Sequence, residues 1–143
     1  MAHSGRAAQI VMIEDNRVDR IRATKALASV KLLNELHTYE RAEEALDAFA
    51  NKVVHPDLIL LDLNLPGMSG QEFLAEIKKE PKLCQVPVVA LTSSEADEDV
   101  VSAWGLGVSA YIVKPVDLAG LSQVMQELAE FYFEVVVLPP HDD

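Results

Sequence analysis

The segment from Leu58 to Gly67 constrains the fold more than any other part of this sequence. It consists of Leu-Ile-Leu-Leu-Asp-Leu-Asn-Leu-Pro-Gly, and its four successive apolar residues predict a strand that is buried on both faces. Pro66 and Gly67 then predict a turn. The strand ends at Asp62, which is either a helix or turn cap or a group placed for chemistry, because open α/β folds bind ligands at the carboxyl ends of their strands.

The rest of the chain supplies a regular alternation of strands and helices. Short apolar runs predict four further strands, at residues 9–13, 35–39, 86–91 and 110–113. Apolar residues at helical spacing predict five helices, at residues 16–30, 42–49, 71–79, 95–104 and 121–132. This alternation implies an α/β fold, a five-stranded parallel sheet with helices on both faces. In the common strand order 2-1-3-4-5, the first and third strands are neighbours.

Charge and cysteine content narrow the class of protein. The formal net charge is −11, from 12 basic and 23 acidic residues, which argues against direct binding to nucleic acid because phosphate would repel the protein. Cys84 is the only cysteine, so an internal disulfide is excluded, as expected in a reducing compartment. No apolar run reaches the length of a membrane span. We therefore expect a cytoplasmic protein without membrane contact.

Polar side chains follow four of the five predicted strands. These side chains belong to Glu14, Asp15, Asp62, Thr92 and Lys114. Each alone is more often a cap or a surface residue, but the strand order 2-1-3-4-5 would bring them to one edge of the sheet. Three carboxylates in contact repel one another unless they bind protons or share a cation. Their oxygen ligands favour Mg²⁺, which keeps water ligands and often binds a phosphate as well.

A metal-bound phosphoryl donor at this edge would meet a set of groups suited to phosphoryl transfer. Asp62, on the central strand, is the best candidate for a nucleophile that forms an aspartyl phosphate. Lys114 offers a positive charge and Thr92 a hydroxyl to the phosphoryl oxygens.

These residues, in this order, resemble the receiver domain of bacterial response regulators, including the chemotaxis regulators, over about residues 9–128. The likeness is carried by four segments, Glu14-Asp15, Asp62 to Gly70, Thr92 to Ser94, and Tyr111 to Pro115. It implies the flavodoxin-like receiver fold. It also implies a single-domain response regulator of a two-component His-Asp phosphorelay, phosphorylated by a sensor histidine kinase and catalysing only its own phosphorylation and dephosphorylation.

The resemblance also assigns roles to individual residues. Asp62 would accept the phosphoryl group, and Mg²⁺ would be held by Glu14, Asp15, Asp62 and the main-chain carbonyl of Asn64. Thr92 and Lys114 would bind the phosphoryl group, and Thr92 would vacate space for Tyr111, the aromatic switch. The alternative for Tyr111 is a half-buried sheet aromatic. The surface of the fourth helix, fifth strand and fifth helix would then change.

Two further features follow from the same resemblance. The peptide bond between Lys114 and Pro115 is often cis in the family. Asn64 and Ser94 flank the expected path of the attacking water and are candidates for tuning the phosphoryl lifetime.

The end of the chain is more apolar than a minimal receiver requires. We expect residues 1–143 to form a single receiver domain with a core at about 9–128, a tail at about 129–140 and no output domain. The tail resembles stand-alone receivers that partner bacterial phytochromes and form homodimers, which implies a bacteriophytochrome kinase. The predicted dimer face consists of Phe131, Tyr132, Phe133, Val135 and Val137. The alternative is that the tail packs back on its own sheet.

Two other functions compete with a phosphorylated regulator. An aspartate-nucleophile phosphatase or phosphotransferase acting on a small molecule usually needs a second acid two residues after the nucleophile, where this chain has Asn64. A non-phosphorylated adaptor with the receiver fold would be expected to lose residues of the edge, and none is missing.

Overall fold

The computed structural model describes residues 7–30 and 34–140. Its centre is a sheet of five parallel strands in the order β2-β1-β3-β4-β5. The strands are β1 (Ala8–Ile13), β2 (Asn34–Tyr39), β3 (Leu58–Leu61), β4 (Val88–Thr92) and β5 (Ala110–Val113). The predicted fold class and strand order are therefore confirmed.

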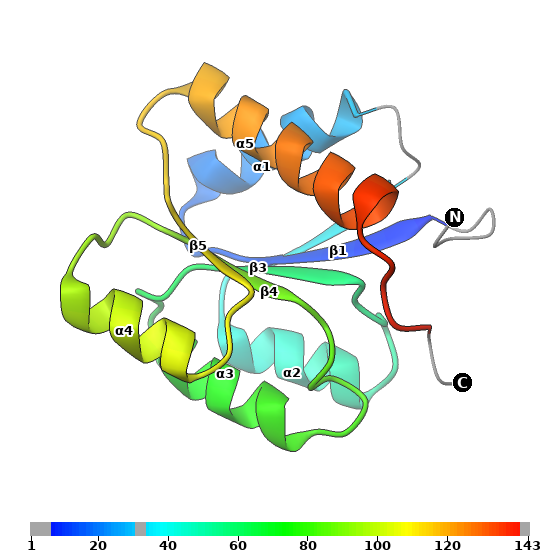
Figure 1. Ribbon diagram of the computed structural model, residues 1–143, viewed down its shortest axis with the longest axis vertical. Helices are drawn as coiled ribbons and strands as arrows, with labels where there is room; N and C mark the ends of the chain where they lie inside the picture. The colour runs from blue at the N-terminus through cyan, green and yellow to red at the C-terminus, as the bar shows by residue number, and fades with distance from the viewer. Residues whose placement is uncertain (1–6, 31–33, 141–143) are drawn as a thin grey trace.

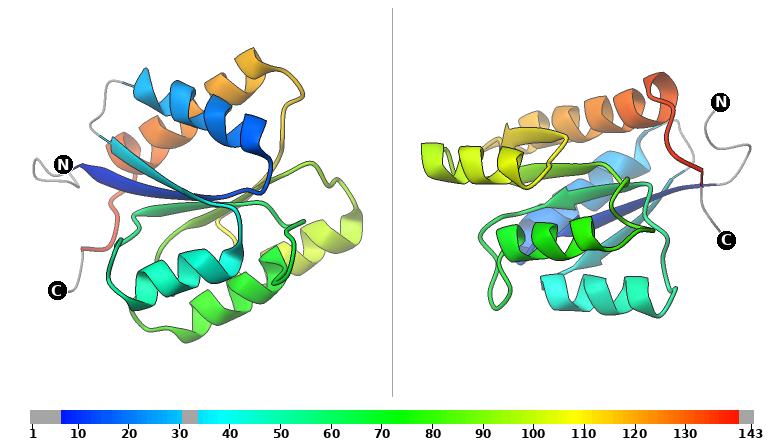
Figure 2. Two further views of the ribbon diagram at one scale, coloured as in Figure 1. Left: turned by 180° about the vertical axis from the view of Figure 1, so that it is seen from behind. Right: turned by 60° about the horizontal axis from the view of Figure 1, so that its bottom comes forward.

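Five α-helices cover the sheet in two layers. They are α1 (Arg17–Ala28), α2 (Ala42–Ala50), α3 (Gly70–Lys79), α4 (Asp97–Gly105) and α5 (Leu118–Glu130). Helices α1 and α5 lie on one face, and α2, α3 and α4 lie on the other (Figures 1 and 2). No helix in the described ranges has the length and apolar character needed to cross a membrane.

The two faces of β3 explain why its four residues are all apolar. Leu58 and Leu60 are buried in the core beneath α1 and α5, whereas Ile59 and Leu61 are buried in the core beneath α2 and α3. Alternate side chains of a strand point to opposite faces, and each such burial contributes about 1.5–3 kcal/mol. The strand is thus fixed from both sides, and the position of Asp62, directly after Leu61, is fixed with it.

Local signals set the helix starts near the carboxyl edge of the sheet. The Asn16 side chain accepts a hydrogen bond from the Asp19 backbone N–H and so caps the start of α1. Ser69 and Glu72 form a capping box at the start of α3. A Cβ atom at Gly70 would lie 2.6 Å from the Leu63 Cα and 2.8 Å from the Asp62 carbonyl oxygen. Only glycine therefore lets α3 begin this close to Asp62.

Some element boundaries differ from the predicted ones. β4 begins at Val88 instead of Val86, because the Val86 N–H is bonded to the Leu83 carbonyl in the preceding turn and Pro87 has no N–H to donate. α4 begins at Asp97 instead of Glu95.

The last predicted helix changes character near its end. Regular α-helix stops at Glu130, and Phe131–Val135 form a π-helical turn. Tyr132 (7% exposed) and Phe133 (1%) are buried, whereas Phe131 is 51% exposed. Phe131, which lies within the predicted helix at residues 121–132, therefore does not share the buried face of α5.

The predicted dimer face needs a corresponding correction. Tyr132 and Phe133 belong to the core under α1 and α5, and Val136 and Leu138 pack against the same core, so this part of the tail packs back on its own domain. Phe131 and Val137 remain exposed. The side chain of Val135 lies outside the described part of the structure.

Candidate functional site

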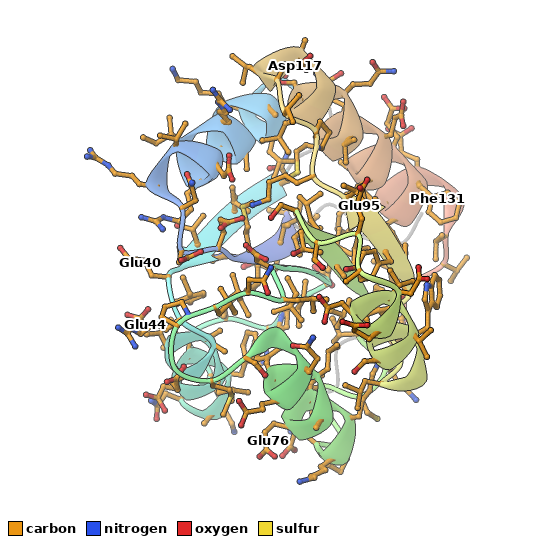
Figure 3. The ribbon with its side chains drawn as sticks, turned by 90° about the vertical axis from the view of Figure 1, so that its left-hand side faces the viewer. Glu40, Glu44, Glu76, Glu95, Asp117 and Phe131 are labelled. Carbon is orange, nitrogen blue, oxygen red and sulfur yellow. The ribbon has the colours of Figure 1, made fainter. Side chains whose placement is uncertain are left out.

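The carboxyl ends of four strands bring the predicted residues together. Figure 3 looks onto this edge of the sheet. Glu14 follows β1, Asp62 follows β3, Thr92 ends β4 and Lys114 follows β5. The Lys114 Nζ lies 2.5 Å from Glu14 Oε1 and 3.6 Å from Asp62 Oδ2, and Thr92 Oγ1 lies 2.8 Å from Asp62 Oδ1. Side chains as far apart as residues 14 and 114 therefore form one site.

The two carboxylate oxygens of Asp62 have different surroundings. Oδ1 accepts hydrogen bonds from the Thr92 hydroxyl (2.8 Å) and from the Asn64 backbone N–H (3.1 Å). Oδ2 accepts no hydrogen bond from the described residues, and its nearest cation is the Lys114 ammonium at 3.6 Å. The carboxylate is thus held by one oxygen while the other is free for attack on an electrophile.

Glu14 is the most buried acid of the site, with 1% of its surface exposed. Its oxygens accept hydrogen bonds from Lys114 and from the Asn16 backbone N–H. Burial raises the pKa of Glu14 from 4.5 to about 7, with a smaller contribution from the charge of Asp62, although the bonds from Lys114 and Asn16 oppose the shift. Glu14 therefore exchanges a proton near neutral pH.

Lys114 remains charged despite its partial burial. Burial alone would lower its pKa, but the hydrogen bonds to Glu14 and Asp19 outweigh this effect, and the pKa is raised overall. The ammonium is therefore a permanent positive charge beside Asp62.

Three acids are arranged so that they could share one divalent cation. Glu14, Asp15 and Asp62 each offer a carboxylate oxygen, and these oxygens all lie within 4.8 Å of one another. Asp15 is exposed while Glu14 and Asp62 are buried, so the cluster opens to solvent on one side. Oxygen ligands with room for water suit a hard divalent ion. Asn64 is exposed and follows Asp62 by two residues. Its main chain is therefore close to the cluster along the chain.

Two contacts at the site were not predicted. Asp19 Oδ2 lies 2.9 Å from the Lys114 Nζ, although the sequence indicates Asp19 only as the capped residue of α1. One signal in the sequence could have identified Asp19: it is an acid in the first turn of α1, a helix that starts at the edge of the sheet where the site lies. Arg20 donates from Nη1 to the Glu14 carbonyl oxygen at 2.8 Å and pairs with Glu40 at 3.3 Å.

The predicted switch residue lies beside the site and is not in direct contact with Asp62. The Tyr111 hydroxyl donates to the Ser94 carbonyl oxygen at 2.9 Å, and its half-buried ring packs against the core under α3 and α4. The Ser94 hydroxyl donates to Asp99 at 2.6 Å and accepts from the Ala96 N–H, so it holds the turn before α4. The described residues contain no cis peptide bond, and Lys114–Pro115 is trans.

Comparison with known proteins gives one consistent family. The model of the response regulator receiver domain matches residues 10–126. The response regulator Rcp1 of Synechocystis sp. strain PCC 6803 is 35% identical over 135 residues, which cover 91% of this chain and 92% of Rcp1.

Two solved structures have the same fold over nearly their whole length. The phosphorylated cyanobacterial phytochrome response regulator RcpA has a TM-score of 0.88 at 36% identity, covering 94% of this chain and 99% of RcpA. The Mn²⁺-bound form of Rcp1 has a TM-score of 0.86 at 34% identity, covering 92% and 99%. A similar protein therefore binds a divalent ion, and in this chain Glu14, Asp15 and Asp62 could hold one.

Proposed function

The chain belongs to the response regulator receiver domain family, and we propose that Asp62 is the residue that accepts the phosphoryl group in a His-Asp phosphorelay. The observation that supports this proposal is the asymmetry of the Asp62 carboxylate. Its Oδ1 accepts hydrogen bonds from Thr92 and Asn64, whereas its Oδ2 accepts none from the described residues and lies 3.6 Å from Lys114. An oriented carboxylate with one free oxygen is suited to nucleophilic attack on phosphorus.

The surrounding residues have separate roles in the transfer. Oδ2 forms the new bond to phosphorus as the bond between phosphorus and the donor breaks, and the donor leaves with the electron pair. Lys114 then offsets charge on the phosphoryl oxygens. The Thr92 hydroxyl, bonded to Oδ1 before the reaction, turns to a phosphoryl oxygen afterwards. This movement frees space beside Tyr111 and changes the surface of α4, β5 and α5.

Mg²⁺ is the cation that we propose for the acid cluster. Glu14, Asp15, Asp62 and the Asn64 main-chain carbonyl would hold it, and it would supply positive charge to the phosphoryl oxygens. Asn64 and Ser94, which follow Asp62 and Thr92 by two residues, tune the lifetime of the phosphoryl group.

The phosphoryl donor in this proposal is a sensor histidine kinase. Helices α1 and α5 both begin at the edge that carries Asp62, and exposed apolar side chains lie at these two starts. They belong to Val18, Ile21, Val116 and Leu118. Such residues provide a docking surface for a kinase helix beside Asp62.

We also propose an input and an assembly for the protein. RcpA is a cyanobacterial phytochrome response regulator, which supports a bacteriophytochrome kinase as the partner of this chain. We place the protein in the cytoplasm as one receiver domain that signals through protein contacts, without direct nucleic-acid binding. The exposed Phe131 and Val137, next to α5, provide the apolar surface of a symmetric homodimer.

Intact mass measurement tests the phosphoacceptor directly. The protein is incubated with Mg²⁺ and acetyl phosphate, and the expected product is a single phosphate adduct that is absent from Asp62→Asn. Asp47→Asn makes the same substitution at an exposed site on α2 and should still form the adduct. An adduct that persists in Asp62→Asn, or that never forms in the wild type, would contradict the proposal, and turnover of a phosphate ester would favour a small-molecule phosphatase.

A further inference from the structure

The Lys114 ammonium is shared unequally among three acids. It lies 2.5 Å from Glu14 Oε1 and 2.9 Å from Asp19 Oδ2, both within hydrogen-bond distance, and 3.6 Å from Asp62 Oδ2, which is beyond it. An ammonium has three N–H donors, and two of them are used by acids other than Asp62. The Lys114 ammonium is therefore hydrogen-bonded to Glu14 and Asp19 and not to Asp62, the proposed phosphoacceptor.

The position of Asp19 is fixed by the start of α1. Its backbone N–H donates to the Asn16 side chain at 3.0 Å, and its side chain is only 15% exposed. The next residue, Arg20, donates to the Glu14 carbonyl oxygen, which ties the first turn of α1 to the loop after β1. The Asp19 carboxylate is thus held in a fixed position, within hydrogen-bond distance of the Lys114 ammonium.

We infer that Asp19 is a positioning residue that competes with the phosphoryl group for Lys114. Before phosphorylation it holds the ammonium away from Asp62 Oδ2, so that this oxygen stays free of a hydrogen bond. When an anionic group is bound on Asp62, the ammonium must give up Asp19 to contact it. Asp19 therefore weakens the hold of the site on a phosphoryl-like anion. This inference rests on the proposed phosphoacceptor role of Asp62.

Beryllofluoride, an anion that adds to a carboxylate as a phosphoryl group does, measures this competition without chemical turnover. Its affinity is determined by ¹⁹F NMR titration at saturating Mg²⁺. Asp19→Asn removes the competing charge but keeps the backbone N–H and the side-chain volume, so we expect beryllofluoride to bind about five-fold more tightly than to the wild type. Asp19→Glu retains the charge and should restore an affinity near that of the wild type. Thermal melting verifies that each variant is folded.

Two controls separate this effect from a general loss of negative charge. Glu40 is an exposed acid that pairs with Arg20 and not with Lys114, and Glu40→Gln should change the affinity less than two-fold. In a Lys114→Ala background, Asp19→Asn should no longer tighten the binding of beryllofluoride, because the ammonium for which Asp19 and the anion compete is absent.

The possible results have distinct meanings. An unchanged or weaker affinity in folded Asp19→Asn, or an equal gain in the Lys114→Ala background, would overturn the positioning role while leaving the phosphoacceptor intact. A wild-type protein that binds no beryllofluoride with Mg²⁺ would overturn the proposed function and this inference together.

Discussion

At the scale of single residues, Asp62 and Glu14 show how burial and hydrogen bonding assign different roles to two acids in one site. Glu14 has hydrogen bonds to both of its oxygens, which suits a group that stays in place. Asp62 has hydrogen bonds to Oδ1 only, which leaves Oδ2 reactive. Thr92 determines this difference, because its hydroxyl is one of the two donors to Oδ1.

The Thr92 hydroxyl should therefore contribute to stability as well as to chemistry. Thr92 is fully buried, and Thr92→Val replaces its hydroxyl by a methyl group of similar volume. We expect the free energy of unfolding to fall by about 1–3 kcal/mol in urea titrations, because a buried carboxylate oxygen loses a donor. Thr92→Ser keeps the hydroxyl and is the matched control. A Thr92→Val variant as stable as the wild type would show that the bond carries no net stabilisation.

Glu14 should make stability depend on pH in a specific window. Its pKa is about 7 in the folded protein, against 4.5 for the ordinary group, so the folded state binds more protons than the unfolded state between these values. Its contribution to the free energy of unfolding is therefore fully present below about pH 4.5 and is lost as pH rises to about 7. The difference between the wild type and Glu14→Gln, measured by urea titration across this range without divalent cation, should show this slope. A difference that is constant with pH would contradict the shifted pKa.

The sequence predicts which side chains converge where a residue directly ends a strand, while their roles stay predictions. Glu14, Asp62, Thr92 and Lys114 all lie at the edge because strand order alone places them there. Asp19 could not be found in this way, since its contact with Lys114 depends on how α1 leaves β1 and on which way its first turn faces. That orientation depends on the tertiary structure and cannot be predicted from the spacing of residues in the sequence.

At the scale of secondary-structure elements, α5 and the tail differ most from expectation. The buried residues continue at four-residue spacing from Leu128 and Ala129 to Tyr132 and Phe133, a spacing that keeps side chains on one face of a helix. The helix widens to a π-helical turn at Phe131–Val135 and ends in extended backbone at Val136. Sequence periodicity identified an apolar helix end, but it did not distinguish packing on the domain's own core, where Tyr132 and Phe133 lie, from exposure at a dimer face.

The packing of the tail can be tested with two phenylalanines that are two residues apart. Phe133→Ala removes a side chain that is 1% exposed and should lower the free energy of unfolding by about 3–5 kcal/mol. Phe131→Ala, at a position that is 51% exposed and stacks edge-on with Tyr132, should cost about 1 kcal/mol or less. Urea titration of both variants measures the contrast. Equal losses would mean that the tail does not pack as described.

At the scale of the whole molecule, the site and the tail lie on different parts of one fold. The strands end at the edge shown in Figure 3, whereas the tail runs from the far end of α5 past the start of β1 (Figure 1). Phosphorylation at Asp62 must therefore be transmitted through β5 and α5 if it is to alter contacts at the tail. In the proposed function, Tyr111, on β5 and bonded to the Ser94 carbonyl, would begin this transmission.

The proposed homodimer predicts a mass that can be measured. Light scattering after gel filtration at micromolar concentration should give twice the chain mass of 15.7 kDa. Val137→Asp introduces a charge at an exposed tail position and should shift the mass towards the monomer. Val101→Asp makes the same change on α4 and should leave the dimer intact. A wild-type monomer at these concentrations would contradict the dimer.

The central claim, that the free oxygen of Asp62 takes the phosphoryl group, is tested most directly by locating the acyl phosphate. After incubation with acetyl phosphate and Mg²⁺, borohydride reduces an aspartyl phosphate to homoserine, and peptide mass spectrometry identifies the converted residue. We predict homoserine at position 62 alone, and none at this position in Asp62→Asn or without phosphodonor. Homoserine at Asp15 or another acid, with Asp62 unmodified, would contradict the account.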